Sequence, residues 1–209
     1  MKVPAFFASH TKEGLLASDG HFSGVRAVAG QRTVPFGEAT ARGIIRDVRS
    51  PAVVVDCDSL TRGVFTEGVL KSMKVRGADI WYMTYIETVD DVFDGFNTDA
   101  EMLMAPYHTV LDDDEFRDIH SVSDSVIPTV FVRKGYGIVS RRRKDPVTRI
   151  LEHLTDLGFY KTCVLDTDDS LSDYDWASIY EDFPAAIPFT DSRRASEQGF
   201  PITIEPFMV

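Results

Sequence analysis

The stretch VIPTVFVRKGYGIVSRRRKDPVTRILEHLTDLGFYKTCVLDTDD, residues 126–169, decides the fold of this chain. Residues 126–132 form a β-branched run that is typical of a buried strand. Asp145 and Pro146 then predict a helix start, with Asp145 as the N-cap and Pro146 in the first helical position. Apolar residues at helical spacing follow, a Leu-Gly pair indicates the helix end, and residues 162–165 form a second apolar run. This strand–helix–strand unit requires a parallel sheet with a right-handed crossover.

The same alternation of strand and helix continues along all 209 residues, with a repeat of about 25 residues and no linker or low-complexity segment. Strands are expected near residues 3–8, 24–30 (a short strand or hairpin arm), 52–55, 79–85, 101–105, 126–132, 162–165, 185–189 and 202–204. Helices are expected near residues 37–48, 64–75, 89–96, 112–120, 145–157, 174–182 and 191–198. The pattern predicts one domain, 1–209, with the fold of a compact (β/α)₈ TIM-type barrel with thin closing units; a doubly wound open sheet is the alternative.

The composition limits the partners of this protein. A net charge of −11 and a pI near 4.8 argue against binding to nucleic acid or to an acidic membrane surface. One basic cluster departs from this balance: Arg141, Arg142, Arg143 and Lys144. We expect it to form a solvated loop, with a phosphate- or nucleic-acid-binding patch as the alternative. The expected partner is a small molecule, with or without a phosphate group.

Cysteine usage and hydropathy indicate the compartment. Cys57 and Cys163 both lie in apolar runs, which predicts two small buried side chains rather than a disulfide or a metal site. No secretory signal is recognisable, and no apolar run approaches the roughly 18 residues of a membrane span. We therefore expect a cytoplasmic protein, without a metal or an organic cofactor.

Three segments together resemble the ProFAR isomerase and imidazole glycerol phosphate synthase cyclase family of histidine biosynthesis, including its archaeal-type relatives. They are GVRAVAGQR at residues 24–32, VVDCD at residues 54–58, and the stretch quoted above. The resemblance implies a (β/α)₈ barrel and isomerase- or lyase-like chemistry on a phosphorylated sugar. It also implies an acidic residue at the end of the first strand and another at the end of the fifth, acting as acid and base.

The positions of those two acidic residues are occupied by Phe7 and Phe131, and a phenyl ring cannot transfer protons. If the first strand instead spans residues 15–18, its acidic residue is Asp19. The phosphate-binding turns of the family are altered as well, because their glycines are absent. Thr190 and Ser192, after the seventh strand, remain as candidates to bind one anion.

A second resemblance concerns Asp56 and Asp58, which follow a buried strand as in haloacid-dehalogenase-type phosphatases. In that class of enzyme a nucleophilic aspartate attacks the phosphoryl group, and later aspartates, here Asp166 or its neighbours, hold Mg²⁺. The alternative is that these strand-end aspartates cap loops and helices. The histidines are scattered, and no spacing typical of a metal site supports them as ligands.

Two classes of function therefore remain. One is an enzyme acting on a small metabolite, with Asp56, Asp166, His108, Asp19 and Arg133 as candidate catalytic groups. The other is a non-catalytic barrel that binds a ligand or partner. An open polar pocket with two convergent titratable side chains would favour the enzyme. Filling of the barrel mouth by Phe7 and Phe131 would favour the binding protein.

Overall fold

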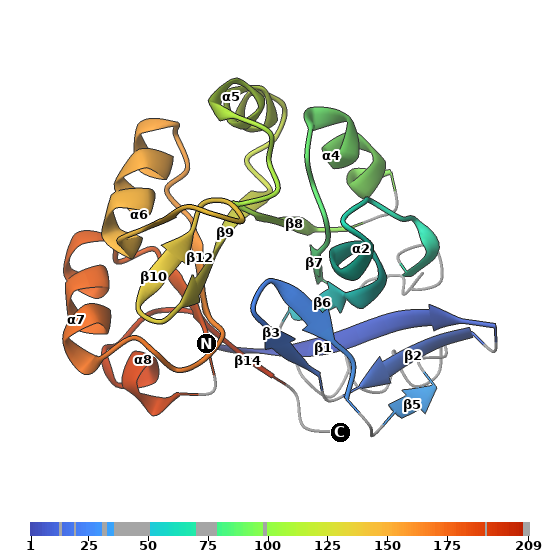
Figure 1. Cartoon of the computed structure of the whole chain (residues 1–209), viewed down its shortest axis with the longest axis horizontal. Coiled ribbons are helices and arrows are strands. Elements are labelled where there is room, and N and C mark those ends of the chain that lie inside the picture. The colour runs from blue at the N-terminus through green and yellow to red at the C-terminus, as the bar shows by residue number, and fades with distance from the viewer. Residues whose placement is uncertain are drawn as a thin grey trace.

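Eight parallel strands close into a barrel in the computed structural model of this chain (Figure 1). The residues described are 1–12, 14–18, 20–30, 33–35, 51–69, 79–97, 100–190 and 192–206. The barrel strands, in their order round the barrel, are β1 (Lys2–Thr11), β6 (Ala52–Asp56), β7 (Ile80–Met83), β8 (Met102–Pro106), β9 (Val126–Arg133), β12 (Cys163–Asp166), β13 (Ile187–Phe189) and β14 (Thr203–Pro206). Strand β14 pairs in parallel with β1, which closes the barrel and excludes the open sheet.

Helices surround the strands, as the repeat in the sequence predicts (Figure 1). They are α2 (Cys57–Arg62), α4 (Val89–Phe96), α5 (Asp113–Val122), α6 (Val147–Asp156), α7 (Asp173–Asp182) and α8 (Arg193–Glu197). The predicted cap of α6 is wrong by one residue: Pro146 is the N-cap, while Asp145 pairs in a short strand. The helix expected at residues 37–48, and residues 70–75 of the helix expected at 64–75, lie outside the described residues; the start of the latter prediction is wrong, because residues 64–67 are not helical.

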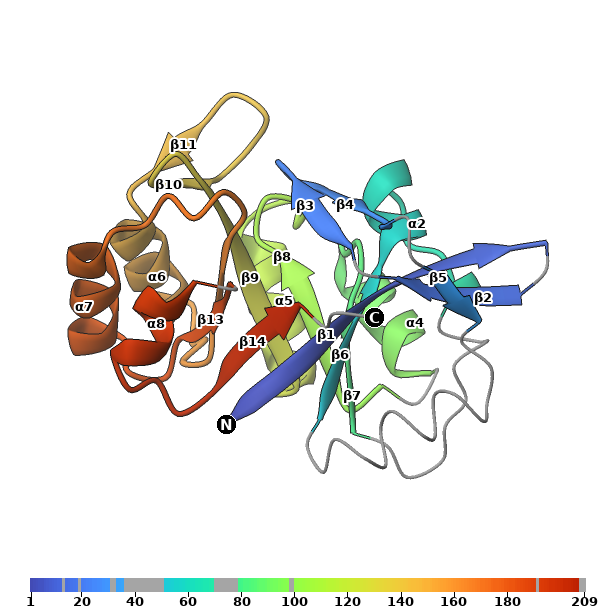
Figure 2. The same cartoon turned by 90° about the horizontal axis from the view of Figure 1, so that it is seen from below.

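Short antiparallel strands extend the barrel at its carboxyl end. They are β2 (Gly14–Ser18), β3 (His21–Ser23), β4 (Arg26–Val28), β5 (Thr33–Pro35), β10 (Tyr136–Ile138) and β11 (Lys144–Asp145). Figure 2 shows the β3–β4 and β10–β11 hairpins at the same end of the barrel. Strand β2 pairs antiparallel with β1 outside the barrel, so the alternative frame with residues 15–18 as the first barrel strand is wrong. Asp19 lies outside the described residues.

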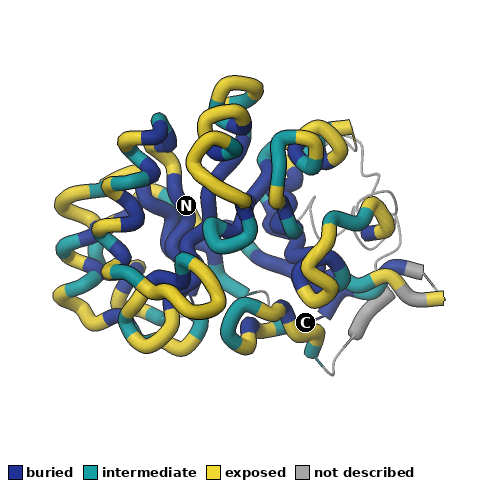
Figure 3. Tube along the Cα trace, turned by 45° about the horizontal axis from the view of Figure 1, so that its top comes forward, coloured by how far each residue is buried: buried dark blue, intermediate teal, exposed yellow. Residues whose placement is uncertain are grey.

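The buried strands divide their side chains between two cores. Along β7, Trp81 and Met83 join the cluster inside the barrel, while Ile80 and Tyr82 join the cluster beneath the helices. This alternation follows from the period of two in a strand, and both sides are apolar because helices cover the outside. Figure 3 shows the result as a buried centre within a largely exposed ring. None of the described helices is long and apolar enough to cross a membrane.

Four phenyl rings close the carboxyl end of the barrel. Phe7, Phe131 and Phe189 project inward from three strands and are at most 1% exposed. Phe22 of the β3–β4 hairpin packs against all three, with ring centroids at 5.1, 5.3 and 5.7 Å. The chain can pass close to the Phe7 ring because residue 20 is a glycine. A Cβ atom at this position would collide with that ring. We call Phe7, Phe22, Phe131 and Phe189 the phenyl plug.

Removal of the central ring of the plug tests its energetic importance. We expect Phe22→Ala to lower the free energy of unfolding by about 3 kcal/mol, because it deletes a buried ring and leaves a cavity. Urea denaturation would measure this. Tyr174→Ala is the control, since Tyr174 is 81% exposed and should change stability by no more than about 0.5 kcal/mol. Equal stability of the two variants would show that the hairpin does not seal the barrel.

Candidate functional site

A cavity of about 890 Å³ lies at the carboxyl end of the barrel, beside the phenyl plug. Its walls come from the β3–β4 turn, α2, the loops after β7 and β8, and the β10–β11 turn. The lining residues are Val25, Arg26, Leu60, Thr61, Arg62, Gly63, Tyr85, His108, Thr109, Ser140, Arg141 and Arg142. We call it the arginine pocket. The carboxyl end of the strands is where barrels of this type carry their sites.

Local sequence signals place each arginine. Helix α2 begins at the cap Asp56 and ends at Gly63, which has a φ of 68° in the left-handed region, so Arg62 stands in its last turn. Ser140 Oγ accepts hydrogen bonds from the backbone N–H groups of Arg142 and Arg143, at 3.4 and 3.2 Å, which shapes the β10–β11 turn. These caps and turns are short-range features, and they hold the chain so that cationic side chains reach one cavity.

The four guanidinium groups give this pocket a charge opposite to that of the whole chain. Arg26, Arg62, Arg141 and Arg142 are exposed, and none makes an ion pair with a residue that the structure describes. No Asp or Glu is among the described lining residues, although the net charge of the protein is −11. Arginine recognises phosphate and carboxylate in a planar, bidentate geometry. The pocket is therefore suited to a small anion.

His108 is the candidate residue that the structure brings into this pocket. Its ring packs edge-on against Phe131 of the plug, with centroids 5.0 Å apart. Its Nδ1 is buried without a hydrogen-bond partner among the described residues. Burial lowers the pKa of His108 to about 4, so the imidazole is neutral at pH 7. Since Nδ1 is the buried atom, Nε2 is the ring nitrogen left to face a ligand.

Asp56 has a structural role. Because Val55 points into the barrel, its neighbour Asp56 points outward, beneath the helices. Oδ1 accepts from the N–H groups of Asp58 and Ser59, each at 3.0 Å. Oδ2 accepts from the hydroxyl groups of Ser59 and Tyr82, each at 2.5 Å. Burial raises the pKa of Asp56, against the opposing effect of these bonds. A carboxylate held at both oxygens and hidden from the pocket cannot act as an accessible nucleophile.

The carboxylate of Asp166 is also held by hydrogen bonds and has a structural role. It follows the inward-facing Leu165, so it also points outward, and it accepts from the N–H groups of Ser170 and Leu171 at 3.1 and 2.9 Å. Burial raises its pKa, and those two bonds oppose the rise. Strands β6 and β12 are separated by three strands in the barrel, so Asp56 and Asp166 stand on opposite sides. They do not form the joint nucleophile and Mg²⁺ site of a phosphatase.

The other candidates lie apart from the arginine pocket. Arg133 is an exposed residue over the β3–β4 turn, near Gly24. Thr190 is buried, and its Oγ1 accepts from the N–H of Ser192 at 3.1 Å. Ser192 Oγ in turn accepts from Arg194 and caps α8. Both hydroxyl groups thus serve the local turn, and neither lines the arginine pocket.

The cysteines are buried and free, as predicted. Burial raises the pKa of the Cys57 thiol to about 12, and it also raises that of Cys163, so both are unreactive at pH 7. Within the described residues, no group of three or more His, Cys, Asp or Glu side chains is arranged to hold a metal ion.

Neither a scan against protein-family models nor a search of curated proteins found a match to this chain. The resemblance to the histidine-biosynthesis family therefore stays a prediction, and the chemistry of the site rests on its own residues. Sequence reasoning missed Arg26 and Arg62. The available signal was weak: each is a single arginine close to a strand or short helix at the carboxyl end.

The structural role of Asp56 is testable by truncation. Asp56→Ala leaves the N–H groups of Asp58 and Ser59, the second of them buried, and two hydroxyl groups without their acceptor. We expect the free energy of unfolding to fall by about 3 kcal/mol, measured by urea denaturation. Glu181→Ala, on the exposed face of α7, should stay within about 0.5 kcal/mol of the parent. An Asp56→Ala variant of full stability would refute the capping role.

The neutral state of His108 predicts a pH dependence. In the unfolded chain its pKa is near 6.5, and in the folded protein it is about 4. Between these values the unfolded state binds more protons, so His108 makes the free energy of unfolding decrease as the pH falls from about 7 to 4. His108→Leu should remove roughly 2–3 kcal/mol of that decrease, measured by urea denaturation at each pH. Parallel curves for variant and parent would contradict the assignment.

Proposed function

We propose that this protein binds a small phosphate-bearing ligand in the arginine pocket and does not carry out the acid–base reaction of the family that it resembles. The observation that carries the proposal is the set of four arginines around one cavity whose described lining residues include no Asp or Glu. Each guanidinium offers two parallel N–H donors to phosphate oxygens. Tyr85, Val25 and Leu60 provide an apolar wall for the organic part of the ligand.

The barrel mouth supports binding rather than proton transfer. The resemblance implies carboxylates at the positions of Phe7 and Phe131, where the phenyl plug is found instead. Asp56 and Asp166 point outward and are held by hydrogen bonds. Of the proposed catalytic residues that the structure describes, His108 alone lines the pocket, and an acid–base rearrangement needs a group on each side of the reacting carbon atoms. A ligand-binding barrel fits this arrangement best.

The mode of phosphate recognition then differs from that implied by the family. Glycine-rich turns bind phosphate through backbone N–H groups. This chain instead presents side-chain cations on two hairpin turns and one short helix. Side-chain cations tolerate a range of ligand positions, and their attraction is screened by salt. Binding should therefore weaken as ionic strength increases.

Isothermal titration calorimetry with ribose 5-phosphate and inorganic pyrophosphate tests this proposal. We expect both compounds to bind and ribose not to bind. The double variant Arg141→Gln/Arg142→Gln should bind at least ten times more weakly, which corresponds to about 1.4 kcal/mol. Arg193→Gln, an exposed arginine on α8 outside the pocket, is the matched control and should bind as the parent does. Absence of binding to the parent, or unchanged binding to the double variant, would overturn the proposal.

A further inference from the structure

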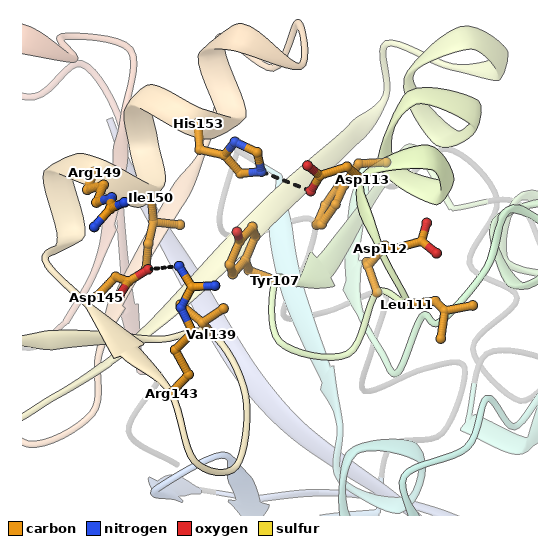
Figure 4. A pocket seen from close by; sticks show the side chains of 12 residues that line it. Tyr107, Leu111, Asp112, Asp113, Val139, Arg143, Asp145, Arg149, Ile150 and His153 are labelled. Atoms are coloured by element: carbon orange, nitrogen blue, oxygen red, sulfur yellow. Dashed lines mark hydrogen bonds and ion pairs between the residues drawn. The ribbon is translucent and has the colours of Figure 1, made fainter.

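A second cavity, of about 360 Å³, lies between α5 and α6 on the outer side of the loop after β8 (Figure 4). Its lining residues are Tyr107, Val110, Leu111, Asp112, Asp113, Phe116, Val139, Arg143, Asp145, Arg149, Ile150 and His153. It shares no lining residue with the arginine pocket, and the turn at residues 139–143 separates the two. We call it the interhelical pocket.

Both signs of charge are present in this pocket, on opposite walls. Arg149 projects from α6, and Asp112 and Asp113 stand at the start of α5, with the Tyr107 ring between them in Figure 4. Two internal pairs are already formed: Arg143 with Asp145 at 2.6 Å, and His153 Nε2 with Asp113 Oδ1 at 2.9 Å. The β10–β11 hairpin and α6 thus supply the cations, α5 supplies Asp112 and Asp113, and the remaining carboxylate, Asp145 of β11, is paired with Arg143.

Unused hydrogen-bonding capacity remains on each wall. The Arg149 guanidinium makes no ion pair or hydrogen bond with a described residue, although the ion pairs formed by its neighbours are resolved. Asp112 uses Oδ1 to cap α5, accepting from the N–H groups of Asp114 and Glu115 at 3.0 Å, and its Oδ2 has no described donor. Asp113 Oδ2 is free in the same sense. The floor is apolar, with Phe116 and Ile150 buried beneath the charged rim.

We infer that the interhelical pocket binds a small zwitterion of the amino-acid class, with its carboxylate on Arg149 and its ammonium group on Asp112 and Asp113. A simple anion would meet the two carboxylates, and a simple cation would meet Arg149. A molecule carrying both charges satisfies both walls at once, because each charged wall then gains a charge-assisted hydrogen bond. An aliphatic side chain on the ligand would lie against Phe116 and Ile150. This inference does not depend on the arginine pocket.

The test is thermal unfolding of the parent protein with glycine, γ-aminobutyrate and L-leucine, each against sodium acetate and methylammonium chloride at equal ionic strength. At least one zwitterion should raise Tm by roughly 5–10 °C at 100 times its Kd, and neither single-charge compound should do so. An equal rise with acetate or methylammonium overturns the inference. So does the absence of any rise with all three zwitterions at 50 mM.

Two variants assign the binding to the two walls. Arg149→Gln should abolish the rise in Tm. Asp112→Asn should weaken the affinity for the zwitterion at least tenfold. It should leave α5 intact, because asparagine is as good an N-cap as aspartate. Arg193→Gln is the matched control and should keep the full rise. A rise that persists in both pocket variants would place the zwitterion elsewhere and refute the assignment.

Discussion

The arrangement of the carboxyl end of the barrel depends on one contact, the packing of Phe22 against three inward-facing phenyl rings. Those edge-to-face contacts, with centroids between 5.1 and 5.7 Å, place the β3–β4 hairpin over the barrel axis. The hairpin in turn supplies Val25 and Arg26 to the arginine pocket. Because the axis is filled, the pocket lies at the rim, between loops that follow neighbouring strands. The packing of Phe22 therefore both closes the barrel and determines where the arginine pocket lies.

Much of the fold is predictable from local pattern. Continuous apolar runs mark strands that are buried on both sides, and residues 89–96 are expected as a helix and form α4 (Val89–Phe96). The fold class is confirmed by the parallel pairing of β14 with β1. Helix α2 is missed, since its six residues are too few for a periodic signal and its start depends on the Asp56 cap. The phenyl rings at the ends of two barrel strands, Phe7 and Phe131, can be read from the sequence, but their enclosure by Phe22 depends on contacts between distant segments.

The candidate site is less predictable, for two physical reasons. A strand-end aspartate looks available in sequence, but whether it points inward or outward depends on the strand register. Asp56 and Asp166 each follow an inward-facing residue, so each is turned away from the mouth. The arginine pocket leaves no recognisable pattern in the sequence. Its four arginines come from three separate elements, namely two hairpins and one helix. The role of a basic cluster such as residues 141–144 can be inferred only when the residues around it in the fold are known.

The turn at residues 139–143 forms part of the wall of both cavities. The N–H groups of Val139 and Ser140 donate to the carbonyl oxygen of Arg143 at 3.0 and 3.1 Å, so hydrogen bonds within the turn hold its two ends together. Its arginines diverge, with Arg141 and Arg142 facing one cavity and Arg143 the other. A shift of the turn that tightens one cavity must alter the other. Any two ligands whose binding shifts this turn would be thermodynamically linked, and each would change the affinity of the other by the same factor.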